Sequence, residues 1–183
     1  MLEVAGRLLA TQGYNATSMD EIAAGAGITK PMLYAYFGSK HGLYLSYIER
    51  AAEQLFERLL SAVPAELPVE RRLVLGLDAF LAFVDERRDG WAVLFQQAAA
   101  QDAPLAGEVA ARREQLAGVA TRMLSEIARH RGSMRDPAQL AAAGHALVGA
   151  AESLANWWLA HPEVRRATVL SALVELTGLD LSV

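Results

Sequence analysis

The stretch TSMDEIAAGAGITKPMLYAYFGSK, residues 17–40, decides the fold of the N-terminal part of the chain. Its letters SMDE, which begin at Ser18, have the S-x-x-E pattern of a capping box at the start of a helix. Gly27 stands where a sharp turn is expected, because glycine adopts a positive φ without steric cost. Thr29 can cap a second short helix, and Pro31 then falls in its first turn, where a missing amide costs little. The stretch therefore predicts two short helices joined by a tight turn, a helix-turn-helix.

The same stretch holds Lys30 and Lys40, which are the only two lysines in a chain of 183 residues with a net charge of −4. Positive and negative side chains balance within residues 1–50, so the acidic excess lies in the remainder. Salt screens charges that lie more than about 10 Å apart, so a local basic surface can act within an acidic chain. The net charge therefore does not exclude a nucleic acid as partner.

The composition predicts an all-α protein with a substantial core. Hydrophobic residues make up 53% and charged residues 21% of the chain, alanine is abundant and β-branched residues are sparse. The absence of cysteine excludes disulfides, and no apolar run approaches the roughly 20 residues that span a bilayer. We expect a cytoplasmic protein without a membrane partner.

Helical periodicity continues through almost the whole chain, interrupted by glycine and proline. The expected helices are residues 2–11, 19–24, 30–36, 40–62, 69–88, 91–100, 105–130, 137–160 and 163–177. The short helices near the start differ in character from the long ones that follow. We therefore divide the chain into a DNA-binding domain, residues 1–46 with the helix-turn-helix at about 18–37, and a helical ligand-binding and dimerisation domain, residues 47–183.

The segments GYNATSMDEIA, AGITKPMLYAYF and GSKHGLYLSYI, in this order, resemble the DNA-binding head of TetR-family transcriptional regulators. The resemblance covers residues 2–48, whereas the body is similar to the family only in the number and lengths of its helices. It implies a three-helix head on a larger helical body. It also implies a repressor that binds a palindromic DNA operator as a homodimer and is released by a small apolar effector ligand.

The resemblance assigns roles to individual residues of the head. Thr29 would meet a phosphate at the start of the recognition helix, and Lys40 would hold the DNA backbone from the next helix. Only Lys30 and Met32 among the expected groove residues plausibly carry sequence information. The predicted DNA-binding residues are Thr17, Ser18, Thr29, Lys30, Pro31, Met32, Tyr34, Tyr36 and Lys40.

Family members generally begin some residues earlier, with a basic arm before the first helix. Met1 falls where this helix is already under way. Either the natural start lies upstream or the contacts of that arm are absent. In the second case we expect weaker DNA binding, because each lost phosphate contact removes free energy of counterion release.

The resemblance also implies a ligand cavity and a dimer interface in the body. Residues that could line the cavity are Phe80, Phe83, Trp91, Phe95, Gln96, Met123 and Trp157, although aromatic residues at helical spacing are more often core. The expected interface, on apolar faces rich in small residues, comprises Leu140, Leu147, Val148, Ala151, Leu154, Trp158, Leu170, Leu173 and Val174. The alternative for this second set is the core of a single chain.

The sequence offers little support for an enzyme. The four histidines are scattered, without a metal-binding spacing, and the chain has neither a glycine-rich phosphate loop nor a G-x-S-x-G motif. We therefore expect no metal, no cofactor and no catalytic residues. The remaining alternative is a helical ligand-binding or oligomerising protein whose degenerate head does not bind DNA.

Overall fold

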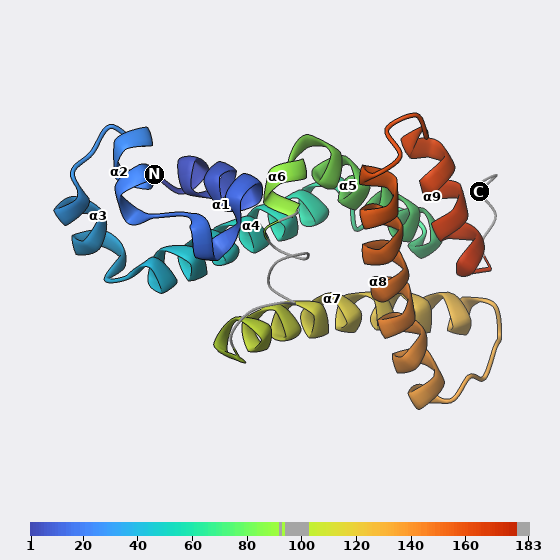
Figure 1. The fold of residues 1–183 in the computed structure, drawn as a ribbon. Helices are drawn as coiled ribbons and strands as arrows, with labels where there is room; N and C mark the ends of the chain where they lie inside the picture. Colours follow the sequence, from blue (N-terminus) through green and yellow to red (C-terminus); the bar gives the residue numbers. More distant parts are fainter. Residues whose placement is uncertain (92, 94–102, 179–183) are drawn as a thin grey trace. The chain divides into compact units, whose positions relative to one another are not determined.

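The structure is a computed structural model of the 183-residue chain, and it describes residues 1–91, 93 and 103–178. The described residues form helices and connecting loops without a strand, so the all-α prediction is confirmed (Figure 1). The helices are α1 (Leu2–Ala16), α2 (Met19–Gly25), α3 (Lys30–Phe37), α4 (Lys40–Ala62), α5 (Val69–Glu86), α6 (Arg88–Trp91), α7 (Ala103–His130), α8 (Pro137–Leu159) and α9 (Arg166–Leu176).

The contacts within the chain divide it into two compact units. The first unit, the head, comprises residues 1–54 and 87–109, and the second, the body, comprises residues 55–86 and 110–183. The boundary predicted at residue 46 lies within α4, which continues from the head into the body. The head therefore includes α6, which the sequence analysis placed in the body.

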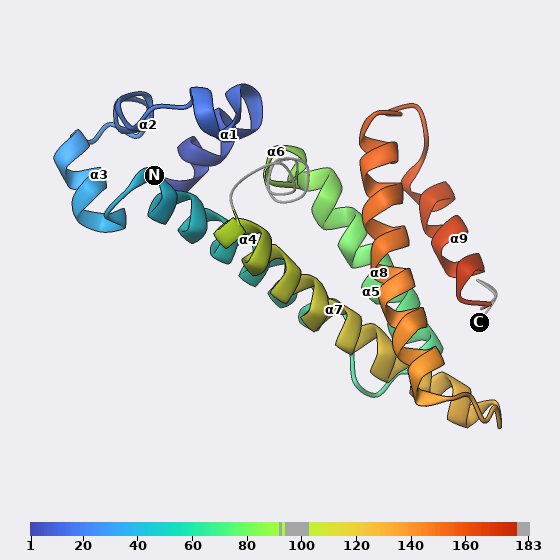
Figure 2. The same cartoon turned by 60° about the horizontal axis from the view of Figure 1, so that its bottom comes forward.

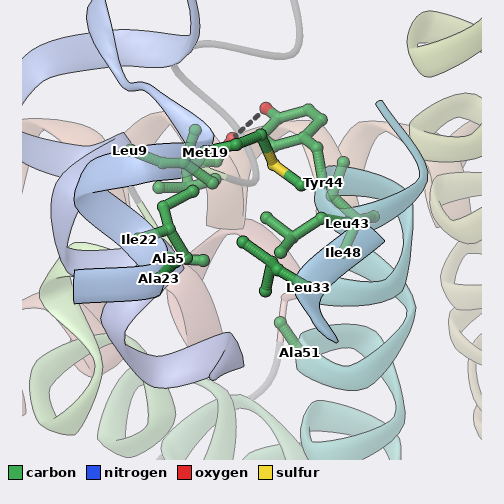
Figure 3. Close-up of a cluster of buried hydrophobic side chains, with 11 residues drawn as sticks. Ala5, Leu9, Met19, Ile22, Ala23, Leu33, Leu43, Tyr44, Ile48 and Ala51 are labelled. Atoms are coloured by element: carbon green, nitrogen blue, oxygen red, sulfur yellow. Dashed lines mark hydrogen bonds between the residues drawn. The ribbon is translucent and has the colours of Figure 1, made fainter. Parts of the chain in front are cut away.

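A single apolar cluster holds the head together (Figure 3). Its buried side chains are Ala5, Leu9, Met19, Ile22, Ala23, Leu33, Leu43, Tyr44, Ile48, Ala51 and Val93. The Tyr44 hydroxyl donates a hydrogen bond to the Val93 carbonyl over 3.1 Å, drawn as a dashed line in Figure 3. Burial raises the pKa of Tyr44 to about 12, so this hydroxyl remains a hydrogen-bond donor above the ordinary tyrosine value of 10.0 as well as at neutral pH.

Most predicted helix ends agree with the structure to within two residues. The predicted helix 91–100 lies mostly outside the described residues, and α6 ends at Trp91, where that helix was expected to begin. Two other ends differ for local reasons. At Gly13 the backbone leaves the helical region, with φ 82° and ψ 165°, and α1 then continues to Ala16. The helix end predicted near Gly13 is therefore a kink within α1. Helix α9 begins at Arg166, later than predicted, because a turn closed by the hydrogen bond from Val164 N to the His161 carbonyl precedes it.

In the body, α5, α8 and α9 pack against one another, and α8 crosses α7 (Figures 1 and 2). The crossing is close, because a Cβ atom added at Gly144 of α8 would lie 2.8 Å from the carbonyl oxygen of Ala117 on α7. The indole Nε1 of Trp158 donates to the Val164 carbonyl over 2.7 Å and fastens the loop that joins α8 to α9. No helix among the described residues is long and apolar enough to cross a membrane.

Candidate nucleic-acid interface

Helix α2 begins with the capping box that the sequence predicts. The Ser18 amide donates to the Glu21 carboxylate over 2.9 Å, and the Glu21 amide donates to the Ser18 hydroxyl oxygen over 3.2 Å. Hydrogen bonds from Ser18 lower the pKa of Glu21, because they stabilise the ionised carboxylate. The capping-box prediction is confirmed.

The turn between α2 and α3 depends on Gly27, which has φ +66°. The amide of Ile28, just after it, donates to the Ala23 carbonyl over 3.0 Å and closes the end of α2. Thr29 then caps α3, its hydroxyl oxygen accepting from the Met32 amide over 3.4 Å, and Pro31 lies in the first turn. The predictions of a glycine turn, a threonine cap and a proline in the first turn of α3 are therefore confirmed.

Helix α3 has a buried side and a side open to solvent. Leu33 is fully buried in the head cluster. Five of the predicted DNA-binding residues on this helix are exposed, with Lys30, Pro31 and Met32 in its first turn and Tyr34 and Tyr36 further along. This arrangement presents one ammonium group, two hydroxyls and two apolar side chains along a helix that can enter a major groove.

Lys30 is bound by a carboxylate that the sequence analysis did not connect with it. Its Nζ atom lies 2.7 Å from Oδ2 of Asp20 on α2, and both side chains remain about half exposed or more, at 46% and 68%. The hydrogen bond to Asp20 raises the pKa of Lys30. The only indication of this ion pair in the sequence is the placement of opposite charges in the first turns of α2 and α3.

Lys40 joins the start of α4 to the end of α1. Its Nζ atom donates to the Asn15 carbonyl over 3.3 Å and stands 4.5 Å from the centre of the Tyr14 ring. A cation over an aromatic face is favourable, so Lys40 contributes to the packing of the head. The role of Lys40 in holding the DNA backbone stays a prediction.

The phosphate contact predicted for Thr17 is wrong for its side chain. Thr17 is 1% exposed, and both its amide and its hydroxyl donate to the Gly13 carbonyl, at 3.2 Å and 2.8 Å. The hydroxyl of Ser18 donates to the Glu21 carboxylate over 2.7 Å. With a carboxylate already at the start of α2, these two hydroxyls serve the fold of the head instead of a phosphate.

The capping box gives a prediction that can be measured without DNA. We expect Ser18→Ala to lower the free energy of unfolding by about 1 kcal/mol at neutral pH and to raise the pKa of Glu21. The pKa of Glu21 is lowered in the folded chain, so its stabilisation is present above the ordinary value of 4.5 and is lost as the pH falls through the folded value. The difference in melting temperature between wild type and Ser18→Ala should therefore narrow in acid. A constant difference from pH 7 to pH 3 would contradict this account.

The predicted cavity residues are divided between the two compact units. Phe80 and Phe83 are buried in the body, where Met123 is half-buried, whereas Trp91 is fully buried in the head. Phe95 and Gln96 lie outside the described residues.

Trp157 is 46% exposed and stacks on His161, with ring centres 4.5 Å apart. Its side chain lies partly on the surface of the single chain, and its place in a ligand cavity stays a prediction. Among the described residues, no group of His, Asp or Glu side chains could hold a metal ion.

Five residues predicted at the dimer interface belong to the core of the single chain. Leu147, Ala151, Trp158, Leu173 and Val174 are each at most 7% exposed. These five side chains offer almost no surface to a partner in the single chain, so the alternative of intrachain core fits them better, and their role in a dimer stays a prediction. The remaining four, Leu140, Val148, Leu154 and Leu170, are half-exposed.

The exposed residues of α8 form a stripe at helical spacing, which we call the outer face of α8. It consists of Ala142, Ala146, Gly149, Ser153 and Trp157, and the exposed His145 borders it. Its small side chains allow another helix to approach closely, and Trp157 adds a large apolar surface at one end. Sequence periodicity did not select this stripe.

Two family descriptions match the chain. "Bacterial regulatory proteins, tetR family" matches residues 1–47, and "Tetracyclin repressor-like, C-terminal domain" matches residues 69–178.

Among individual proteins, the HTH-type transcriptional activator FasR of Mycolicibacterium smegmatis is 29% identical over 159 residues, which cover 87% of this chain and 70% of FasR. A TetR-like transcriptional regulator from Rhodococcus sp. RHA1 is 32% identical, with a TM-score of 0.82 and coverage of 97% of this chain and 91% of the other. The regulator FadR of Bacillus subtilis, solved in complex with stearoyl-CoA, has a TM-score of 0.84 at 16% identity, with coverage of 98% and 97%.

Proposed function

The chain belongs to the TetR family of transcriptional regulators, and on this premise we propose that it binds a palindromic operator as a homodimer and responds to a small apolar effector. The observation that carries the proposal is the exposure of α3, on which Lys30, Met32, Tyr34 and Tyr36 are open to solvent while Leu33 is buried. In this proposal α3 enters the major groove of one half-site. Lys30 and Met32 meet base edges, and the tyrosine hydroxyls and Thr29 bind phosphates.

The dimer in this proposal forms through the outer face of α8 and the half-exposed part of α9. Two heads joined in this way can occupy two half-sites about 34 Å apart, one turn of DNA. The support is the exposed stripe of small residues that ends at Trp157, on a helix whose other side is committed to the core of the body. A symmetric pair of such helices would bury the indole, which is 46% exposed in the single chain.

The effector in this proposal is apolar and binds in the body. The support from the chain is the apolar character of α5, which buries Phe80 and Phe83. FadR, which has the same fold, was solved with stearoyl-CoA, a ligand with a long apolar chain. Helix α4 runs without a break from Lys40 in the head to Ala62 in the body, so a shift of this helix could couple the two units. A differential affinity of a few kcal/mol between two states is enough to release the operator.

We propose repression as the outcome of operator binding, and FasR supports activation as the second candidate, because that relative is named an activator. A reporter gene placed behind the DNA upstream of the chain's own gene separates the two outcomes. Expression of the chain should lower the reporter signal if it represses and raise it if it activates.

The two lysines should have separable effects on DNA binding. We expect Lys30→Ala to reduce the preference for the operator over unrelated DNA, because a base-reading side chain is lost. We expect Lys40→Ala to weaken binding to all sequences and to reduce the slope of log affinity against log salt by about 1. Fluorescence anisotropy with labelled duplexes at several salt concentrations measures both. Equal changes in preference and in slope from the two variants would contradict the division of roles.

Lys40→Ala needs its own control, because Lys40 also contacts Asn15 and Tyr14. Lys40→Arg keeps the charge near the DNA backbone, and thermal melting of both variants reports the loss of packing. A normal salt slope in Lys40→Arg, with the reduced slope in Lys40→Ala, assigns the effect to the charge.

A further inference from the structure

The ion pair between Asp20 and Lys30 places a negative charge in the middle of the proposed DNA-binding surface. The Nζ and Oδ2 atoms are 2.7 Å apart, and neither side chain is buried. Asp20 lies in the first turn of α2, and Lys30 is the first residue of α3, so the pair bridges the two helices of the helix-turn-helix. Any group that approaches Lys30 from the DNA also approaches the Asp20 carboxylate.

The carboxylate changes which DNA atoms Lys30 can bind favourably. An ammonium group has three N–H donors, and Asp20 engages Lys30 in the structure, so donors remain for a second acceptor. A phosphate brought to these donors adds a negative charge close to Asp20, and the two like charges repel. Guanine O6 and N7 are uncharged acceptors and meet much less repulsion there. The pair therefore disfavours contact with the backbone more than contact with a base edge.

Lys40 shows the contrast within the same head. The partners that the structure gives its Nζ atom are the neutral Asn15 carbonyl and the Tyr14 ring. Among the described residues, no carboxylate is hydrogen-bonded to Lys40 as Asp20 is to Lys30, although the charge of Lys40 contributes to the lowered pKa of Glu21. The two lysines thus differ in electrostatic surroundings as well as in position.

We propose that Asp20 is a specificity-determining residue, which holds Lys30 and lowers the affinity of the head for DNA in general more than its affinity for the operator. The inference rests on the proposed function, because it assumes that α3 binds DNA. Asp20, a residue of α2, contributes to the specificity for the operator because its charge disfavours contact between Lys30 and the phosphate backbone. Without this carboxylate, Lys30 would act as one more sequence-independent contact.

The test is Asp20→Asn in the full chain, a change that removes the charge and keeps the size of the side chain. The probes are the duplex from upstream of the chain's own gene that it binds best and a scrambled duplex of equal length. We expect affinity for the scrambled duplex to rise about two- to fivefold, the range for one exposed charge pair. The slope of log affinity against log salt should steepen by about 1, as for one added phosphate contact. The preference for the upstream duplex should fall.

Two controls isolate the pair from the general loss of a negative charge. Glu49→Gln removes one exposed acid of α4 in the head, and we expect it to change the affinities for both duplexes by the same small factor. In a Lys30→Ala background, Asp20→Asn should no longer steepen the salt slope, because the cation that it frees is gone. An undiminished effect in that background would reject the proposal and assign the effect to simple repulsion of DNA by Asp20.

A measurement without DNA tests the pair itself. The chain has two lysines, so ¹³C-labelled lysine gives two sets of NMR signals whose titrations can be followed separately. Because the hydrogen bond to Asp20 raises the pKa of Lys30, we expect Asp20→Asn to lower the pKa of one lysine and to leave the other unchanged.

The results of these experiments distinguish failure of the proposed function from failure of the proposed role of Asp20. If the wild-type chain prefers no upstream duplex over scrambled DNA, the proposed function fails and the role of Asp20 fails with it. If the wild type has a preference that Asp20→Asn leaves unchanged, only the role of Asp20 is rejected.

Discussion

Leu33→Ala should unfold or severely loosen the head and abolish DNA binding. Leu33 is the one fully buried side chain of α3, and it packs among Ile22, Leu43 and Ile48 in the head cluster (Figure 3). Truncating a buried leucine costs about 2–5 kcal/mol, from lost transfer free energy and from the cavity that remains. That is a large fraction of the roughly 5–15 kcal/mol that keeps an ordinary domain folded. Urea unfolding followed by circular dichroism measures the loss.

Tyr36→Ala is the matched control on the same helix. Tyr36 is 66% exposed, so its truncation should change the free energy of unfolding by no more than about 0.5 kcal/mol. The same change should still weaken DNA binding, because a proposed phosphate contact is lost. A stable Leu33→Ala chain, or a Tyr36→Ala chain as unstable as it, would contradict the assignment of inner and outer sides to α3.

The second large effect is expected from Ser153→Arg, in the middle of the outer face of α8. Ser153 is exposed in the single chain, so arginine there should not disturb the fold. In a symmetric dimer it would place a long, charged side chain from each copy between closely packed helices. We expect the chain to sediment as the 19.7-kDa monomer instead of a dimer. Operator affinity should fall by about 100-fold or more, because the second half-site no longer adds to binding.

Ser61→Arg makes the same chemical change at an exposed position of a different helix, α4. It should leave both the sedimentation coefficient and operator affinity close to those of the wild type. Dissociation of the dimer by Ser61→Arg, or a wild-type-like dimer with Ser153→Arg, would place the interface elsewhere. In either case the other half-exposed residues of α9, such as Leu170, become the next positions to substitute.

The helix-turn-helix could be predicted from the sequence because its determinants are local. Caps at Ser18 and Thr29 and the turn at Gly27 each depend on residues within a few positions of one another. The bounds of α4, from Lys40 to Ala62, follow from a cap at one end and a proline-containing break at the other. Such short-range rules apply in any fold, so no knowledge of the packing was needed.

The contacts around the lysines could not be predicted, because they depend on the angle between helices. Asp20 and Lys30 are ten residues apart, and Asn15 and Lys40 are twenty-five apart. The burial of Thr17 was missed for the same reason, since a threonine before a helix is normally exposed to solvent. These contacts between helices altered the roles proposed for Lys30, Lys40 and Thr17, whereas the differences in helix bounds did not.

The buried and exposed sides of α8 could not be told apart from the sequence, because small apolar residues occur on both. Alanine and glycine occur both among its buried residues, such as Ala151, and among its exposed ones, such as Gly149. Periodicity selects a core side only where polar residues mark the opposite one. The packing of α5 and α9 determines which residues of α8 are buried, and that packing is not encoded in α8 alone.

A gel-shift assay tests whether the head binds DNA at a specific palindromic site. DNA from upstream of the chain's own gene is titrated with the full chain in a gel-shift assay, at several salt concentrations. Scrambled half-sites serve as competitor. The account predicts a shifted band that weakens steeply with salt and that the intact palindrome removes far better than the scrambled competitor. A shift that both competitors remove equally, or no shift at low salt, would contradict it and favour a ligand-binding protein whose head does not bind DNA.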